Sequence, residues 1–207
     1  MGQGEGDGLM TAPIPIPTPA DLARPGEADA RCAALVGSYL GGSLDDFGEL
    51  VALTEPVVRR LVARLAPDRA DIDDLVQETY LRAWRRLGQF RGHSRFSTWL
   101  FRIAVNVIHT WRRSRKPMLT LSDAHQSSLS APSDIGDDAL LDAYERALDR
   151  LPPDLKATFV LHEAEGLSYR EVAETLDCPI GTVMSRLHRA RARILDELRD
   201  RLEELTP

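Results

Sequence analysis

The stretch that decides the fold runs from Tyr80 to Lys116 and reads YLRAWRRLGQFRGHSRFSTWLFRIAVNVIHTWRRSRK. Between Thr79 and Ser122 there is no Asp or Glu, yet this window holds ten Arg or Lys residues and seven of the chain's twelve aromatic residues. Guanidinium groups neutralise phosphates, and aromatic faces stack on unpaired bases of any identity. The combination indicates a surface for single-stranded or melted nucleic acid.

A cationic pair of amphipathic helices, with its aromatic rings in the core, is the alternative interpretation of the same stretch. Some of the rings belong to the core in either case, and the candidates are Trp84 and Phe101, together with the neighbouring Ile103. The net charge of the chain is −6, but it is strongly segregated. Residues 1–78 carry −8, 79–122 carry +10, 123–180 carry −9 and 181–207 carry +1. Such blocks predict two basic surfaces on an acidic body.

The composition also indicates in which cellular compartment the protein is expected. Cys32 and Cys178 are the chain's two cysteines, with no metal-ligand spacing around them, so a reducing cytosol is the default expectation. No apolar run approaches the roughly 18–20 residues that span a bilayer. The N-terminus lacks the basic segment and apolar core of a secretion signal. We therefore expect a cytoplasmic protein without membrane insertion.

Helical periodicity dominates the first half of the chain. Residues 1–28 are rich in Gly and Pro and predict a disordered tail. A first domain follows over 30–116, with a short apolar helix at 30–40 and a helix at 45–66 that is expected to break or kink at Pro56. Further amphipathic helices are predicted at 71–87 and at about 96–113, so that three packed helices form this domain.

A linker and a second helical domain complete the chain. Residues 117–137 are rich in Ser, contain Pro and scattered acids, and predict a flexible linker. Helical periodicity returns over 138–205, and no stretch alternates as a strand would. The predicted fold is therefore all-α, with two small helical domains joined by a flexible linker.

The most specific local signal is in this second domain. Ser168 and Glu171 form a capping box, which opens a short helix. A turn over 177–181 follows, then a helix with Val183 and Leu187 on its inner face and polar or basic residues opposite. A capped helix, a tight turn and a basic helix predict a helix-turn-helix whose second helix enters the major groove. An ordinary helical hairpin with a solvated basic face is the alternative.

Two long motifs in this order resemble the extracytoplasmic-function sigma factors of bacterial RNA polymerase. The first is DDLVQETYLRAW at 73–84, followed by FRG at 90–92 and FSTWLFRIAVN at 96–106, and it resembles their region 2. The second runs from Leu151 to Arg193, includes GTVMSRL at 181–187, and resembles their region 4. The resemblance covers about residues 45–116 and 138–203, and the short linker agrees with a family that has no region 3 domain.

The resemblance implies roles for three sets of residues. The first set lies on a helix that docks on core polymerase in the family, and its members are Asp73, Asp74, Leu75, Gln77, Glu78 and Trp84. The resemblance places at the −10 element, for opening DNA and holding an extruded base, Phe90, Arg91, Phe96, Trp99 and Asn106, and we expect His109, Arg112 and Arg113 to touch the duplex just upstream. It places at the −35 element Ser185, Arg186, His188, Arg189 and Arg193. Met184 departs from the basic residue that many relatives carry there.

The acidic helix at 71–78 has a competing interpretation as a two-metal nuclease site. Three of its acids crowd one helical turn, with no His and no second acidic segment to complete a site. A solvated first turn, stabilised by the helix dipole, therefore fits better. The five His residues are scattered, and no zinc spacing links them.

Taken together, these patterns predict a DNA-binding initiation subunit that has no chemistry of its own and needs no cofactor. The partners that the resemblance implies are core RNA polymerase, promoter DNA and an anti-sigma factor. A stand-alone helix-turn-helix regulator is the alternative, but it would need neither the acidic helix nor the acid-free aromatic stretch. A nucleic-acid enzyme would need a catalytic constellation that the sequence does not show.

Overall fold

The computed structural model describes residues 25–43, 45–115 and 137–205, and these residues are almost entirely helical. The tail over 1–24 and nearly all of the predicted linker lie outside the described residues. The first domain contains α1 (Pro25–Leu40), α2 (Asp46–Leu65), the 3₁₀ turn η1 (Arg69–Asp71), α3 (Ile72–Arg86), the 3₁₀ turn η2 (Leu87–Gln89) and α4 (Phe96–Arg115). The second contains α5 (Asp137–Asp149), α6 (Pro153–Phe159), the π-helical turn η4 (Val160–Ala164), α7 (Tyr169–Leu176) and α8 (Ile180–Leu205).

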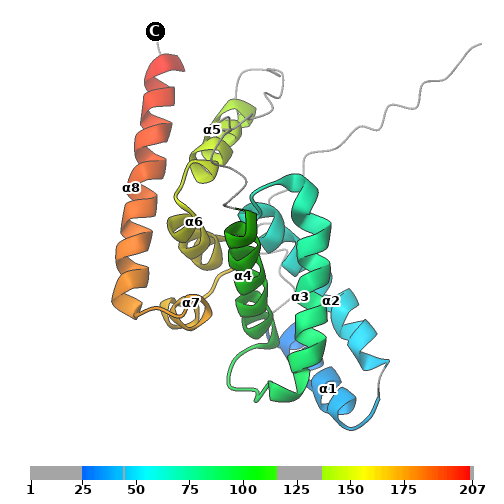
Figure 1. The fold of residues 1–207 in the computed structure, drawn as a ribbon. Coiled ribbons are helices and arrows are strands. Elements are labelled where there is room, and N and C mark those ends of the chain that lie inside the picture. The colour runs from blue at the N-terminus through cyan, green and yellow to red at the C-terminus, as the bar shows by residue number, and fades with distance from the viewer. Residues whose placement is uncertain (1–24, 44, 116–136, 206–207) are drawn as a thin grey trace, which may run out of the picture.

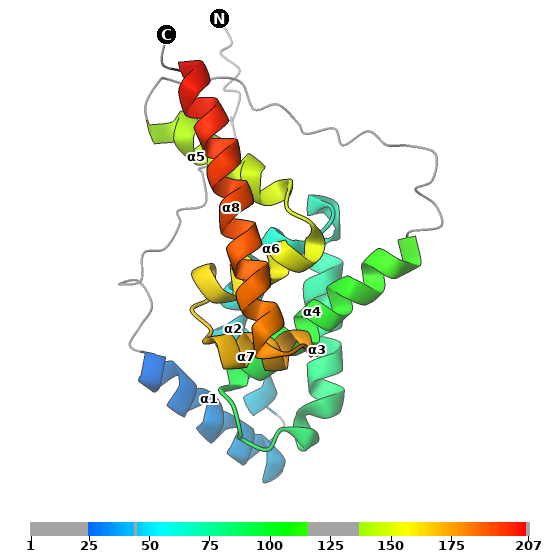
Figure 2. The ribbon, with the colours of Figure 1, turned by 90° about the vertical axis from the view of Figure 1, so that its left-hand side faces the viewer.

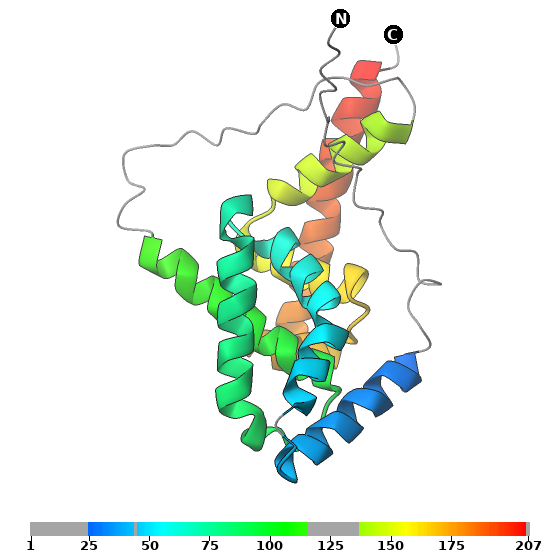
Figure 3. The ribbon, with the colours of Figure 1, turned by 90° about the vertical axis from the view of Figure 1, so that its right-hand side faces the viewer.

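The first domain packs α2, α3 and α4 together as predicted, and adds α1 as a fourth helix against α2 (Figure 3). Apolar residues at helical spacing supply the core, among them Leu61, Leu75 and Leu100, all fully buried. The structure differs from two of the sequence-based expectations. The helix α1 begins at Pro25, inside the predicted tail, which fits the preference of Pro for a first helical turn. The helix α2 also continues through Pro56, so the break that was one of the two expected outcomes there does not occur.

Core membership follows the sequence pattern with one clear exception. Phe101 and Ile103 are buried in the first domain as predicted. Trp84 is not: its side chain is 52% exposed on the outer side of α3. The small Ala83 beside it fills the inward position, so the indole ring has no place in the core.

The second domain is built on a long helix, α8, against which α5, α6 and α7 pack (Figures 1 and 2). The predicted capping box is present: Ser168 Oγ accepts from the backbone N–H of Glu171, whose carboxylate accepts from the Ser168 N–H at 2.9 Å. Asp177 takes the left-handed conformation with φ of 51°, which ends α7 and turns the chain into α8. Val183 and Leu187 are buried on the inner face of α8 as predicted.

The two domains pack against one another along α4. This helix contacts α2 and α3 on one side and α7 on the other, so it lies between the rest of its own domain and the second domain (Figure 1). Apart from Ala143, the buried apolar residues of both domains belong to one continuous cluster. The described ranges contain no helix that combines the length and the apolar character needed to cross a membrane.

Candidate nucleic-acid interface

Three aromatic rings gather at the start of α4. Phe90, Phe96 and Trp99 lie with each pair of ring centroids 5.5 Å apart, Phe90 and Phe96 edge to face. Phe96 is only 3% exposed, whereas Phe90 and Trp99 are partly exposed. Phe96 therefore supports the other two rings from beneath, and in this arrangement it is too deeply buried to stack on a base.

An exposed polar face extends from this cluster along α4. Arg102, Asn106 and Arg113 are exposed at spacings of four and seven residues, on the same side as Trp99. Arg91, in the preceding loop, is exposed as well. Arg102 was not among the predicted contacts, although its position three residues after Trp99 places it on this face. The face therefore combines partly exposed rings with exposed cations, the chemistry that single-stranded nucleic acid requires.

Two of the predicted −10 contacts lie elsewhere. His109 and Arg112 are half-buried on the side of α4 that faces the second domain. Arg112 donates a hydrogen bond to the Leu65 carbonyl oxygen at 2.6 Å. Burial lowers the pKa of His109, partly opposed by the Asp154 carboxylate of the second domain. Their contact with DNA stays a prediction, because in this arrangement both side chains border the second domain.

The first turn of α3 is only partly solvated, contrary to the sequence interpretation. Asp71 is buried and accepts hydrogen bonds from Trp111 Nε1 and from the Arg115 guanidinium, both at 3.0 Å. The Arg115 guanidinium also lies over the Trp111 ring, 4.8 Å from its centroid. Asp71 thus ties the start of α3 to the end of α4, while Asp73 and Asp74 remain exposed.

The outer face of α3 is both acidic and apolar. Asp73, Asp74 and Gln77 are exposed, and one and two turns further along so are Leu81 and Trp84. Leu81 was missed by the sequence analysis, although it lies four residues after Gln77. Of the other predicted docking residues, Leu75 is fully buried in the core and Glu78 pairs with Arg82 at 2.7 Å within the helix. Exposed apolar side chains suit a protein partner, and the carboxylates around them repel the phosphates of DNA.

The outer face of α8 carries the predicted −35 residues. Ser185, His188, Arg189 and Arg193 are all exposed. Arg189 Nε donates to the Ser185 carbonyl oxygen at 3.3 Å, which leaves the terminal guanidinium nitrogens available. Arg186 differs: its side chain is 20% exposed and pairs with Asp154 at 2.9 Å. The exposed set is therefore accessible on this face, whereas Arg186 is held to α6.

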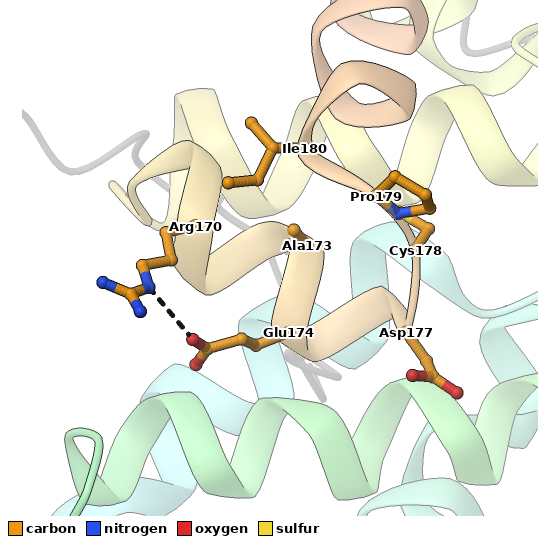
Figure 4. A pocket seen from close by; sticks show the side chains of 7 residues that line it. All are labelled: Arg170, Ala173, Glu174, Asp177, Cys178, Pro179 and Ile180. Carbon is orange, nitrogen blue, oxygen red and sulfur yellow. Dashed lines mark ion pairs between the residues drawn. The ribbon is translucent and has the colours of Figure 1, made fainter.

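The turn between α7 and α8 forms an open groove of about 460 Å³ (Figure 4). Arg170 and Glu174 pair along α7 at 3.5 Å, and Asp177 lies at the far end of this helix (Figure 4). Ile180 begins α8 and is 46% exposed, and Met184 one turn later is 54% exposed. Exposed apolar groups at the start of a recognition helix can contact thymine methyl groups.

In the described ranges, no three His, Cys, Asp or Glu side chains come together in a group that could hold a metal ion. Asp71, the buried member of the acidic cluster, already pairs with Arg115 and Trp111. The fold and its surfaces thus define a two-domain DNA-binding protein, with a helix-turn-helix in one domain and a basic aromatic helix in the other.

Comparison with known proteins identifies the family. Residues 50–117 match Sigma-70 region 2, and residues 141–194 match Sigma-70, region 4. The ECF RNA polymerase sigma-E factor of Escherichia coli strain K12 is 37% identical over 173 residues, covering 77% of this chain and 90% of that protein. The Haemophilus influenzae factor of that name is 37% identical over 181 residues, covering 80% and 94%. The chain belongs to the ECF RNA polymerase sigma factors, as the resemblance predicted.

Solved structures agree with this assignment. The sigma factor RpoE of Bartonella quintana, in complex with the anti-sigma factor NepR, is similar with a TM-score of 0.64 and 32% identity, covering 75% of this chain and 98% of that one. CnrH, in complex with the cytosolic domain of CnrY, gives a TM-score of 0.59 and 25% identity, covering 84% and 97%. The region 2 match disfavours a stand-alone helix-turn-helix regulator, which would have no use for that domain.

Proposed function

We propose that the outer face of α3 is the surface by which this sigma factor docks on core RNA polymerase. The observation that supports this is the exposure of Leu81 and Trp84, 42% and 52%, beside the carboxylates of Asp73 and Asp74. Aromatic side chains that are exposed in the free protein often dominate binding to a partner. Glu78 lies beside this face, whereas Leu75 supports it from the core.

The exposed face of α4 is the surface that would open the promoter. Phe90 and Trp99 would stack on bases as the −10 element unpairs, and the cations Arg91, Arg102 and Arg113 would hold the strand's phosphates. Each stacked base contributes about 1–3 kcal/mol. Since unstacking a base costs a few kcal/mol, two such rings can offset the opening of one step.

Recognition of the −35 element falls to α8. Arg189 has the reach and the planar fork for a guanine edge, a contact that contributes about 1–3 kcal/mol of discrimination. Ser185 and His188 lie on the same exposed face. Arg193, one turn beyond Arg189, would contact phosphate.

The protein acts in the cytoplasm, where it has no chemistry of its own and takes no cofactor. An anti-sigma factor is its further partner. This proposal rests on two solved structures, because RpoE is bound there to the anti-sigma factor NepR and CnrH is bound to the cytosolic domain of CnrY.

Run-off transcription tests the docking surface. Purified core polymerase and genomic promoter fragments should yield transcripts only when the protein is added. Trp84→Ala should reduce both core binding and transcription at least tenfold. Leu40→Ala is the matched control, because Leu40 is also 52% exposed but lies at the end of α1. Equal transcription and equal core affinity for the two variants would exclude the α3 face.

A further inference from the structure

Two large apolar side chains are exposed side by side at the start of α8. Ile180 is 46% exposed, and Met184, one helical turn later, is 54% exposed. Neither belongs to the buried apolar cluster or packs against it, whereas Val183 and Leu187 of the same helix are fully buried. A single exposed apolar residue needs no explanation, but two neighbours that leave the core together indicate a contact with a partner.

The surroundings of this apolar pair favour a partner that is negatively charged. Residues 180–195 include four arginines and no Asp or Glu. Ile180 points toward the side of the groove where Arg170 lies, and Arg170 pairs with the Glu174 carboxylate at 3.5 Å, while Asp177 lies at the other end of α7 (Figure 4). Cations around exposed apolar groups match nucleic acid, whose phosphates enclose the edges of the bases.

A protein partner fits the same pair less well. The next large apolar side chain that α8 exposes is Leu195, which lies eleven residues beyond Met184, about 16 Å along the helix at 1.5 Å per residue. The pair is therefore isolated from it. A stable protein interface buries about 800 Å² on each partner, which is far more than two side chains supply.

The position of the pair on α8 suits contact with base edges. Ile180 and Met184 are the first and fifth residues of this helix, and the N-terminal residues of a recognition helix are those that contact bases in the major groove. A Cβ atom at Gly181 would meet no other part of the protein within 4 Å. Glycine disfavours a helix, and packing does not require it here, so its presence fits a close approach of the backbone to DNA.

The chemistry of the two side chains limits what they can recognise. Ile180 has no polar side-chain atom, and the Met184 thioether is only a weak acceptor, so neither recognises a base by hydrogen bonds as Ser185 and Arg189 would. The major groove presents one apolar group, the C5 methyl of thymine. Methionine is unbranched and adapts to irregular apolar surfaces. Many relatives carry a basic residue at the position of Met184, so this contact would be different from theirs.

We propose that Met184, flanked by Ile180, recognises the C5 methyl group of one thymine in the −35 element. The inference rests on the proposed function, because it takes α8 as the helix that recognises this element. It assigns two kinds of recognition to one helix, since Met184 selects an A·T pair by its methyl group while Arg189 selects a guanine by hydrogen bonds.

Replacement of thymine by deoxyuridine tests this contact, because it removes the methyl group and keeps every hydrogen-bonding atom of the base. Holoenzyme is reconstituted from the full-length protein and purified core polymerase. A promoter fragment that gives run-off transcripts is footprinted to locate the −35 element. Each thymine of that element, on either strand, is then replaced singly in synthetic duplex DNA. Such DNA contains no 5-methylcytosine, so any methyl group that is recognised belongs to thymine.

For the wild type, one deoxyuridine should weaken binding about fourfold, which corresponds to about 0.8 kcal/mol for one buried methyl group at about 1.4 kcal/mol per factor of ten. Met184→Ser should bind the thymine and deoxyuridine duplexes equally, because serine is short and polar, whereas Met184→Leu should keep most of the preference. Leu195→Ala is the matched control: Leu195 is 60% exposed on the same helix, and this variant should keep the full preference.

A wild type that binds every singly substituted duplex as well as the thymine duplex would overturn the inference, and so would a −35 element without an A·T pair. A deoxyuridine effect that Met184→Ser retains in full would show that another residue contacts the methyl group. If the −35 element is protected and Arg189→Ala relaxes its recognition while deoxyuridine has no effect, this inference alone fails. Absent transcripts, or no protection of a −35 element, would refute the proposed function itself.

Discussion

Asp71 is expected to fix the orientation of α4, and its replacement by Ala should destabilise the first domain markedly. Its carboxylate accepts from Trp111 Nε1 and from Arg115, both at 3.0 Å, and its side chain is only 6% exposed. A hydrogen bond to a charged acceptor contributes about 1.5–3 kcal/mol. The pair with Arg115, which is half exposed, adds at most about 1 kcal/mol. We therefore expect Asp71→Ala to lower the free energy of unfolding by about 2–4 kcal/mol.

Urea unfolding followed by circular dichroism measures this loss, and the indole N–H signal of Trp111 in NMR spectra reports on the hydrogen bond directly. Asp74→Ala is the control: it removes an exposed acid from the same helical turn and should cost about 0.5 kcal/mol through the helix dipole. Asp71→Asn keeps an acceptor for Trp111 and should fall between the two. If Asp71→Ala and Asp74→Ala are equally stable, the reasoning about this buried carboxylate is wrong.

Three further outcomes are expected. Trp99→Ala should leave core binding intact but reduce strand opening at the −10 element, so normal permanganate reactivity in a variant with an unchanged melting temperature would contradict the stacking role. Arg189→Ala should relax the sequence preference at one −35 position, whereas Arg193→Ala should weaken binding to all sequences alike and reduce the salt dependence by about one charge. Affinities for single-base DNA variants at two salt concentrations measure both effects. A uniform loss of affinity for Arg189→Ala would show that Arg189 recognises no base. Burial raises the pKa of Glu165, so protonation is easier in the folded state and stability is lost as pH rises through that pKa. Glu165→Gln should therefore melt no lower than wild type at neutral pH and converge with it in acid, and a lower melting temperature at neutral pH would refute this.

The sequence predicted those features that local chemistry decides. The capping box at Ser168, the inner face at Val183 and the turn at Asp177 all depend on residues a few positions apart. The structure confirms all three, although the turn is shorter than predicted because α8 begins at Ile180. Helical periodicity placed the main helices within a few residues, apart from the early start of α1 and the continuation of α2.

Features that depend on distant neighbours were not predictable in this way. A tryptophan in an amphipathic helix is usually core, but Trp84 is exposed because a smaller neighbour takes the inward position. Glu171 caps its own helix and also meets Arg95, a cation 76 positions away that no periodicity links to it. Similarly, His109 and Arg112 extend the basic helix in sequence, yet the packing of α6 turns their surroundings into an interior.

The length of α8 gives the second domain a mechanical property. Its 26 residues form one rod of about 39 Å, at 1.5 Å per residue. The end that bears Ser185 and Arg189 would lie in a groove of the DNA. Further along the helix, Glu197 pairs with Arg150, the residue that follows α5. Because a continuous helix transmits rotation with little bending, a protein that tilts α5 would swing the DNA-bearing end as a lever. Binding far from the side chains that we propose to recognise bases can thus change which promoters they reach.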